Sequence, residues 1–241
     1  MVSGTAEVEV RSGFLAEASG RAHEMLDTVE AMFDRAVDAV CRATDSAEAR
    51  ETVFKMDAGV DAAQRDIRRA LVMHLTANPI GNPAACLALM VVAKDAERAG
   101  DYCKNLAELT ELAHGPLSDG KYGKRLLETF SDVKRLFAPV RAVLEDPSTT
   151  LIRLLTIRAS DLEERCSWQV RQIANDGSLS ENEAVCLALA FRGCRRISAH
   201  LSNTACAAAG LLCGIDTADL KVSRDDRPAR GCTPAQRRRL P

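Results

Sequence analysis

Aromatic residues are scarce in this sequence, which has one Trp, two Tyr and six Phe among 241 residues. Strands favour aromatic and β-branched side chains, whereas Ala and Leu, which supply much of the 46% hydrophobic content here, favour helices. The composition therefore indicates an all-α protein. The chain is long enough for one large domain or for two domains of about 100 residues each.

Zinc-type cysteine spacing and long hydrophobic runs are also missing. The chain has nine Cys but no Cys-x-x-Cys, and most of the Cys lie among Ala and Leu, where a free thiol acts as a small apolar side chain. An odd number of Cys without a secretory signal predicts reduced thiols in the cytoplasm. The longest apolar run, PAACLALMVVA, is too short to span a bilayer. We expect a soluble, cytoplasmic protein that is not an integral membrane protein.

Net charge is small, at −2, but it is unevenly distributed. Residues 221–241 contain seven Lys or Arg and two Asp, which leaves 25 basic and 32 acidic residues, a net charge of −7, in the rest of the chain. An acidic body argues against nucleic-acid binding by the folded part of the protein. The basic tail, 216–241, has few apolar residues to bury and is predicted to be disordered.

Apolar residues recur with a helical period in six segments of about 25 to 35 residues each. Segments rich in helix breakers separate them, at 44–49, 76–83, 114–120, 145–150 and 175–181. Long helices with short connections pack as antiparallel neighbours. Ser180 followed by Glu183 is typical of a capping box that begins the sixth helix, and Pro139 should kink the fourth.

The two halves of the sequence, on either side of Gly115 and Pro116, resemble each other weakly. Six apolar positions in the first segment of the first half match six in the second half at a constant offset. The matched sets are Leu26, Val29, Met32, Phe33, Ala36 and Val40, and Phe130, Val133, Leu136, Phe137, Val140 and Leu144. We therefore predict two tandem three-helix bundles, over residues 14–115 and 116–215, followed by the tail.

Two pairs of carboxylates occur at helical spacing in the first half. Glu97 and Asp101 are four residues apart, and so are Asp57 and Asp61 in the preceding segment. Residues four apart lie on one face of a helix, so antiparallel neighbours could bring the two faces together across a groove. At an effective dielectric constant near 20, each close pair of like charges costs about 3 kcal/mol. A bound cation or raised pKa values would relieve this repulsion.

An all-oxygen ligand set suits iron, manganese, magnesium or calcium better than zinc. The same spacing is also common on solvated helix faces, where the acids would face water or pair with nearby Lys and Arg residues. Small residues beside the acids, among them Gly59 and Gly100, favour a close approach of two helices over simple exposure. From the spacing alone, both interpretations stay open.

The segment KDAERAGDYCKNLAE, residues 94–108, resembles the signature of the PhoU family, which has the form LERIGDhavNIAE. MDAGVDAAQRDIRRALVMHL resembles that family's other acidic helix. The resemblance extends over roughly residues 18–214 and implies six helices in two three-helix repeats. In this family, such acidic pairs bind multinuclear metal clusters, usually of iron, on the surface of the bundle.

Carried over residue by residue, the resemblance implies a metal site formed by Asp57, Asp61, Glu97 and Asp101. The second half departs from the pattern. Where the third segments of the two halves are matched, Arg195 replaces Glu97 and Ala199 replaces Asp101, and the fifth segment has no clean counterpart of the Asp pair. A cationic face has the wrong sign for a metal ion, so we predict one competent site, in the first half, and a degenerate second repeat.

The resemblance also implies the function: a cytoplasmic, non-enzymatic adaptor that tunes phosphate uptake and signalling by contacting a phosphate ABC transporter and a sensor histidine kinase. The resemblance is also compatible with a homodimer. One alternative is a carboxylate-bridged di-iron enzyme, whose bundle uses Glu-x-x-His on two helices. Here only Glu111 and His114 have that spacing, and they abut Gly115. A second alternative is a helical scaffold that binds no metal.

Overall fold

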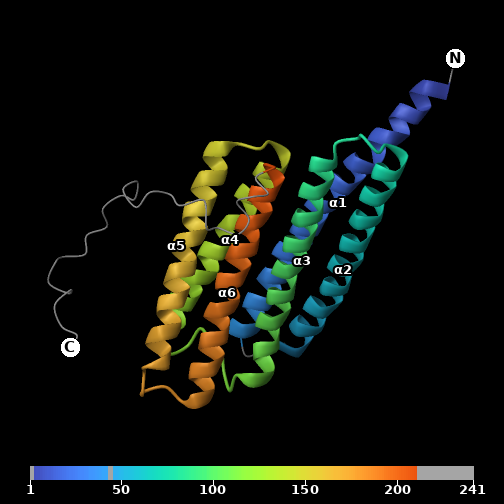
Figure 1. Ribbon diagram of the computed structural model, residues 1–241. Coiled ribbons are helices and arrows are strands. Elements are labelled where there is room, and N and C mark those ends of the chain that lie inside the picture. Colours follow the sequence, from blue (N-terminus) through green and yellow to red (C-terminus); the bar gives the residue numbers. More distant parts are fainter. Residues whose placement is uncertain (1–2, 43–45, 211–241) are drawn as a thin grey trace.

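The computed structural model describes residues 3–42 and 46–210, with side chains from residue 13 onward in the first helix, and these residues form six α-helices and no β-strand (Figure 1). The helices are α1 (Ser3–Cys41), α2 (Ser46–Ala77), α3 (Pro83–Leu112), α4 (Gly123–Glu145), α5 (Thr149–Ala174) and α6 (Glu181–Ala208). The all-α fold class predicted from composition is confirmed. The tail predicted to be disordered, residues 216–241, lies outside the described part of the chain.

The helix boundaries follow the predicted breaks, with differences at α1 and α4. α1 is 39 residues long and begins at Ser3 rather than near residue 14, and α4 has only 23 residues. Apolar periodicity locates only the part of a helix that packs on a core, and the first fully buried side chain described in α1 is Ala18. Leu15 also packs against the core, but the residues before Phe14 show no apolar stripe at helical spacing, so the prediction placed the start too late.

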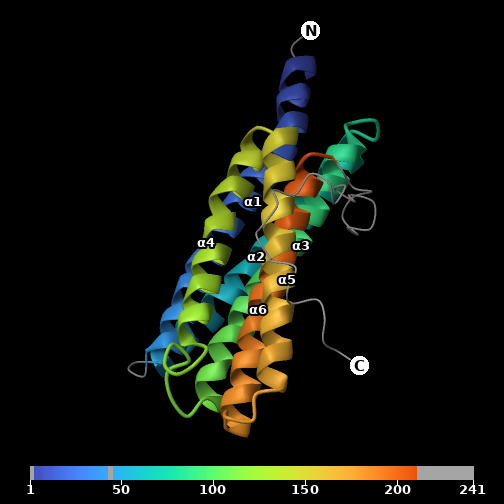
Figure 2. The ribbon, with the colours of Figure 1, turned by 90° about the vertical axis from the view of Figure 1, so that its left-hand side faces the viewer.

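The six helices form two groups of three. α1, α2 and α3 pack on one another, as do α4, α5 and α6, and the groups meet mainly where α3 packs on α6, with a smaller contact between α1 and α4. α5, α6, α3 and α2 lie side by side across one broad face, while α1 and α4 lie behind them (Figures 1 and 2). α3 and α6 therefore occupy the centre of the molecule.

The apolar positions matched between the halves lie in a core that runs through both groups. Of the twelve, eleven are buried and Leu144 is partly buried. Phe33 of α1 contacts Phe130 and Phe137 of α4, with ring centroids 6.1 and 6.0 Å apart. The predicted stripe on the first helix of each half is thus the surface through which α1 and α4 meet the core.

Local interactions at the helix ends agree with the sequence signals. The Ser180 hydroxyl accepts a hydrogen bond from the backbone N–H of Glu183 at 3.2 Å, as predicted for the start of α6. Asn82, with a left-handed φ of 41°, caps α3 by accepting from the backbone N–H of Ala85. At the start of α4, a Cβ on Gly123 would lie 1.7 Å from the carbonyl oxygen of Ser118, so only glycine fits there.

The seven Cys in the described residues are free, and all but the half-buried Cys41 are buried. Burial raises the pKa of Cys166 to about 12, which keeps this thiol protonated and unreactive. Within the described residues, the helices are too polar or too short in their apolar stretches to cross a bilayer.

Candidate functional site

The four carboxylates predicted as metal ligands lie on α2 and α3, which pack on each other, and the strip of surface that these residues share is called the groove here. The Lys104 ammonium of α3 donates to Asp57 of α2 at 2.6 Å and to Asp101 of α3 at 3.3 Å, which joins the two helices. Asp61 and Asp101 both lie close enough to Glu97 to raise its pKa. The fold therefore brings the two acidic pairs together, as the spacing suggested.

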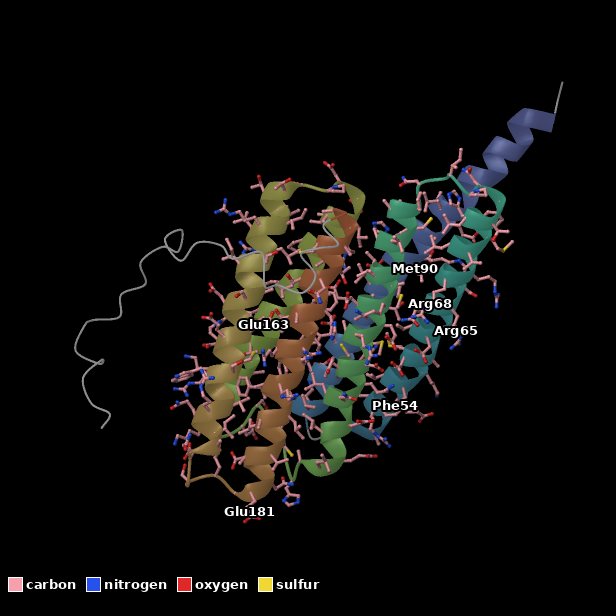
Figure 3. The ribbon with its side chains drawn as sticks, viewed as in Figure 1. Phe54, Arg65, Arg68, Met90, Glu163 and Glu181 are labelled. Carbon is pink, nitrogen blue, oxygen red and sulfur yellow. The ribbon has the colours of Figure 1, made fainter. Side chains whose placement is uncertain are left out.

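The position of the acids follows from the buried stripe of each helix. Val53, Val60 and Ile67 recur every seven residues along α2 and are buried, and Asp57 lies at the edge of that stripe. On α3, Ala96 and Ala99 are buried beside Glu97. Each carboxylate is thus held next to the core rather than out in solvent. Figure 3 shows this side of the molecule and labels Arg65 and Arg68 on α2 and Met90 on α3.

Lys104 supplies a positive charge inside the groove. Its side chain is 24% exposed and that of Asp57 is 12% exposed, so the ion pair is largely removed from water. Burial opposes the charge on Lys104, but the hydrogen bonds and charges of Asp57 and Asp101 outweigh it, and the pKa of Lys104 is raised. The lysine is therefore firmly cationic and bridges α2 to α3.

One lysine does not neutralise the groove. Burial, together with the charges of Asp101 and Asp61, raises the pKa of Glu97 above its ordinary value. The Arg98 side chain, 3.8 Å away, and a hydrogen bond with Gln64 only partly oppose this shift. Burial is the largest cause of this shift, and the charges of Asp101 and Asp61 add to it.

Sequence reasoning missed Lys104 as the partner of the acids. Lys55, a nearby basic residue that could have paired with them, instead contacts Glu51 at 2.7 Å. The spacing of three between Asp101 and Lys104 is an ordinary helical ion-pair spacing and could have flagged the contact within α3. The contact with Asp57, 47 residues away, depends on the packing of α2 on α3.

The small residues beside the acids behave differently from one another. A Cβ on Gly100 would meet Val29, Met32 and Val60 at ordinary contact distances of 3.6 to 3.7 Å, so Gly100 faces the core. A Cβ on Gly59 would meet nothing within 4 Å. The interpretation that Gly59 permits a close helix approach is therefore wrong, because this residue faces open space.

The second half has a different arrangement in the corresponding groove, between α5 and α6. Arg195 of α6, which replaces Glu97 in the sequence match, lies 3.8 Å from Glu163 of α5 (Figure 3). Burial raises the pKa of Glu163, and Arg195, Arg196 and His200 oppose this shift. In this groove a carboxylate faces guanidinium groups, so no comparable excess of negative charge surrounds it.

A buried polar network, also missed from the sequence, joins α3 to α6. Asp95, which is fully buried, lies 2.9 Å from Nδ1 of His200, and the His200 ring stacks on Tyr102 with centroids 5.7 Å apart. The Arg196 guanidinium also lies against Tyr102, 5.6 Å from the centroid of its ring, and its Nε donates to the Tyr102 hydroxyl at 3.2 Å. Tyr102 therefore points toward α6 and away from the acidic groove.

Comparison with known proteins reports what these features resemble. Residues 22–110 match the family model for the PhoU domain. The matched residues include the second half of α1, all of α2 and most of α3, so they contain the four carboxylates and Lys104.

Two solved structures share the fold over both halves. The phosphate transport system regulatory protein PhoU from Streptococcus pneumoniae is 13% identical, with a TM-score of 0.74 over 87% of this chain and 98% of that chain. PhoU from Pseudomonas aeruginosa is 19% identical, with a TM-score of 0.70 over 87% of this chain and 99% of that chain. A search of curated proteins gives no match.

The family resemblance implies that the groove binds a metal. Its donor atoms suit that role, but their arrangement in this structure does not. Four carboxylates and an uncompensated negative charge suit a hard cation. However, oxygens of Asp57 and Asp101 are engaged by Lys104, and among the residues described no three His, Cys, Asp or Glu side chains converge to hold one ion. The ligand role of the four carboxylates stays a prediction.

Replacing Glu97 by Gln should stabilise the metal-free protein at pH 7 by about 0.5 kcal/mol, the scale of a partly exposed charge pair. Folding raises the pKa of Glu97, so its ionisation at neutral pH works against the folded state. The advantage of Glu97→Gln should grow as the pH rises from the ordinary Glu range through the raised pKa, and should vanish in acid. Urea unfolding between pH 4 and 7.5 measures it, and a loss of stability at pH 7 would show that the groove carries no such excess charge.

Proposed function

We propose that this chain is a non-enzymatic regulator of phosphate transport. The observation that carries the proposal is the likeness of both three-helix groups to a phosphate transport system regulatory protein, over 98% of that protein's structure. The PhoU domain match over residues 22–110 supports it independently from the sequence. The partners that we infer are a phosphate ABC transporter and a sensor histidine kinase in the cytoplasm.

The surface offers places for such partners. Five large apolar side chains are exposed near the end of the molecule where α2 joins α3. They are Val72, Met73, Ile80, Leu87 and Met90. Ile80, at the tip of the connection, is 92% exposed. Exposed apolar side chains are a common feature of protein interaction surfaces.

We further propose that the groove between α2 and α3 binds a hard metal cation such as iron, manganese or magnesium, with Asp57, Asp61, Glu97 and Asp101 as ligands. The nearness of the carboxylates supports this proposal, because a cation would offset the charges of Asp101 and Asp61, which add to burial in raising the pKa of Glu97. The bound metal would supply a fixed positive charge between two helices. The chain's own residues would align α2 and α3 around it.

The structure gives little support to the di-iron enzyme alternative. Glu111, which would be a ligand of the Glu-x-x-His type, pairs with Arg50 of α2 at 2.8 Å. His114 lies beyond Leu112, the last residue of α3. The one string with the right spacing is therefore at a helix end rather than inside the bundle.

Phosphate uptake in the native host tests the regulatory proposal. Deleting the gene should change both the rate of phosphate uptake and its response to external phosphate, and a plasmid copy of the full chain should restore them. A pull-down with the tagged full chain should recover the cytoplasmic subunits of the phosphate transporter. Unchanged uptake in the deletion strain, at both low and high phosphate, would contradict the proposal.

A further inference from the structure

We propose that the tip of the α2–α3 hairpin is a lipid-binding surface, through which the chain rests on an anionic membrane without crossing it. The hairpin tip is defined as residues 70–93, which are the end of α2, the connection and the start of α3. The proposal assigns lipid as the partner of the exposed apolar side chains at this end. It goes beyond the regulatory function and depends neither on that function nor on a metal.

The hairpin tip is uncharged and apolar on its outside. It contains no Asp, Glu, Lys or Arg, although these residues make up 27% of the chain. Five large apolar side chains of the tip are exposed, by 39% at Met90 and by 92% at Ile80. The others are Val72, Met73 and Leu87. Charged groups are costly in the apolar part of a bilayer, so an uncharged stretch with apolar side chains outward suits shallow insertion.

A basic side chain lies one helical turn below the apolar ones on each helix. On α2, Arg68 is four residues before Val72, and on α3, Lys94 is four residues after Met90. Residues four apart share a helix face, and all four of these side chains are exposed. Figure 3 shows Arg65 and Arg68 of α2 and Met90 of α3 on the same side of the molecule. A bilayer has the same order of layers, with acyl chains inside and anionic headgroups outside, which favours lipid over a protein partner.

The exposed charge at the level of these basic residues is positive, although residues 1–220 carry a net charge of −7. Of the nearby acids, Asp66 is paired with Arg21 at 2.7 Å, and Asp95 is fully buried. Arg65 and Arg68 are exposed and form no ion pair with the other residues that the structure describes. Their charges are therefore available to anionic lipid, which attracts Lys and Arg close to its surface.

The geometry of the hairpin tip also suits shallow insertion. Met90 lies seven residues after Pro83, the first residue of α3, and so about 10 Å along that helix. Interfacial segments are buried to a depth of about 5–10 Å. Nε2 of the buried His74 donates to the carbonyl oxygen of Gly81 at 3.2 Å, which holds the connection against α2. Figure 2 shows this connection projecting to the side away from α4, while the start of α1 extends upward past it.

Fluorescence of the full chain mixed with lipid vesicles tests the proposal. Trp168, the one Trp of the chain, lies on α5, so Trp168→Phe removes the background signal and Ile80→Trp introduces a probe in the hairpin tip. With vesicles of phosphatidylglycerol and phosphatidylcholine, the emission of the double variant should shift to shorter wavelength. Brominated acyl chains should quench it. Vesicles of phosphatidylcholine alone should bind the protein at least tenfold more weakly.

The matched control is Leu127→Trp in the same Trp168→Phe background, because Leu127 is an exposed apolar residue of α4 outside the tip. Its emission should neither shift nor be quenched. In vesicle sedimentation, Arg68→Gln should weaken binding to the anionic vesicles about fivefold, whereas Arg158→Gln, on α5, should leave it unchanged. The basic residues of 221–241 are the same in every variant, so these differences report the folded part of the chain.

Two results would overturn the proposal. If the anionic vesicles bind the chain but the probe at position 80 is not quenched, another part of the chain binds lipid. If neither kind of vesicle binds the chain, the tip is not a lipid-binding surface. Loss of transporter subunits from the pull-down with Ile80→Asp would then identify it as a protein-docking surface. Phosphate uptake in the deletion strain still decides the regulatory function in each case.

Discussion

Replacing Asp95 by Ala should lower the free energy of unfolding by about 3 kcal/mol, the cost of breaking a buried pair by removing one partner. Asp95 has no exposed surface and is bound to Nδ1 of His200 at 2.9 Å. Among the residues that the structure describes, the other ring nitrogen of His200 has no hydrogen-bond partner, so the variant would leave this buried imidazole without one on either nitrogen. Because the pair joins α3 to α6, the two three-helix groups should separate more easily. Equilibrium unfolding in urea measures the loss.

Glu111→Ala is the matched control for this prediction. It removes a carboxylate from the same helix, but one that is exposed and pairs with Arg50, so the loss should be below about 1 kcal/mol. A double-mutant cycle with His200→Ala should give a coupling energy of more than about 1 kcal/mol between Asp95 and His200. If Asp95→Ala were no more destabilising than Glu111→Ala, the network would not hold the two groups together.

Replacing Asp101 by Asn should weaken Mn²⁺ binding by about a hundredfold, since changes to residues outside the ligand set already weaken metal sites by 10 to 100-fold. Asp101 lies close to Glu97 and accepts a hydrogen bond from Lys104, so its charge acts on both of these side chains. The amide keeps the size of the side chain but removes the negative charge. Folding should be preserved, because the substitution also reduces repulsion with Glu97. Calorimetric titration measures the affinity, and circular dichroism checks the helices.

Asp66→Asn is the control for the Asp101 variant. Asp66 is on α2, where it pairs with Arg21 of α1 at 2.7 Å and lies outside the groove. The control variant should bind Mn²⁺ as tightly as wild type. Equal losses in the two variants would mean that general acidity, rather than this groove, attracts the metal.

The fold was largely predictable because its signals are local. Four of the five breaks between helices contain Gly or Pro, and Ser180 caps α6 through a backbone N–H only three residues away. The acidic pairs were predictable for the same reason, since Asp57 with Asp61 and Glu97 with Asp101 each share a helix face. Antiparallel packing then brought the two faces together.

The missed features depend on pairs that are distant in the sequence. Asp95 and His200 are 105 residues apart, and nothing near either residue indicates its partner. Lys104 reaches Asp57 only because α2 and α3 pack in one register. The charge balance of a groove is set by all the helices that line it, whereas the spacing along one helix reports only that helix.

Elemental analysis of the full chain after reconstitution with Mn²⁺ and gel filtration tests most directly whether the first half alone holds the metal. The comparison needs wild type, Asp101→Asn in the first groove and Glu163→Gln in the second. We predict that wild type and Glu163→Gln retain the same amount of manganese per chain and that Asp101→Asn loses it. Retention by Asp101→Asn, or loss of half of the metal in each variant, would contradict a single site between α2 and α3.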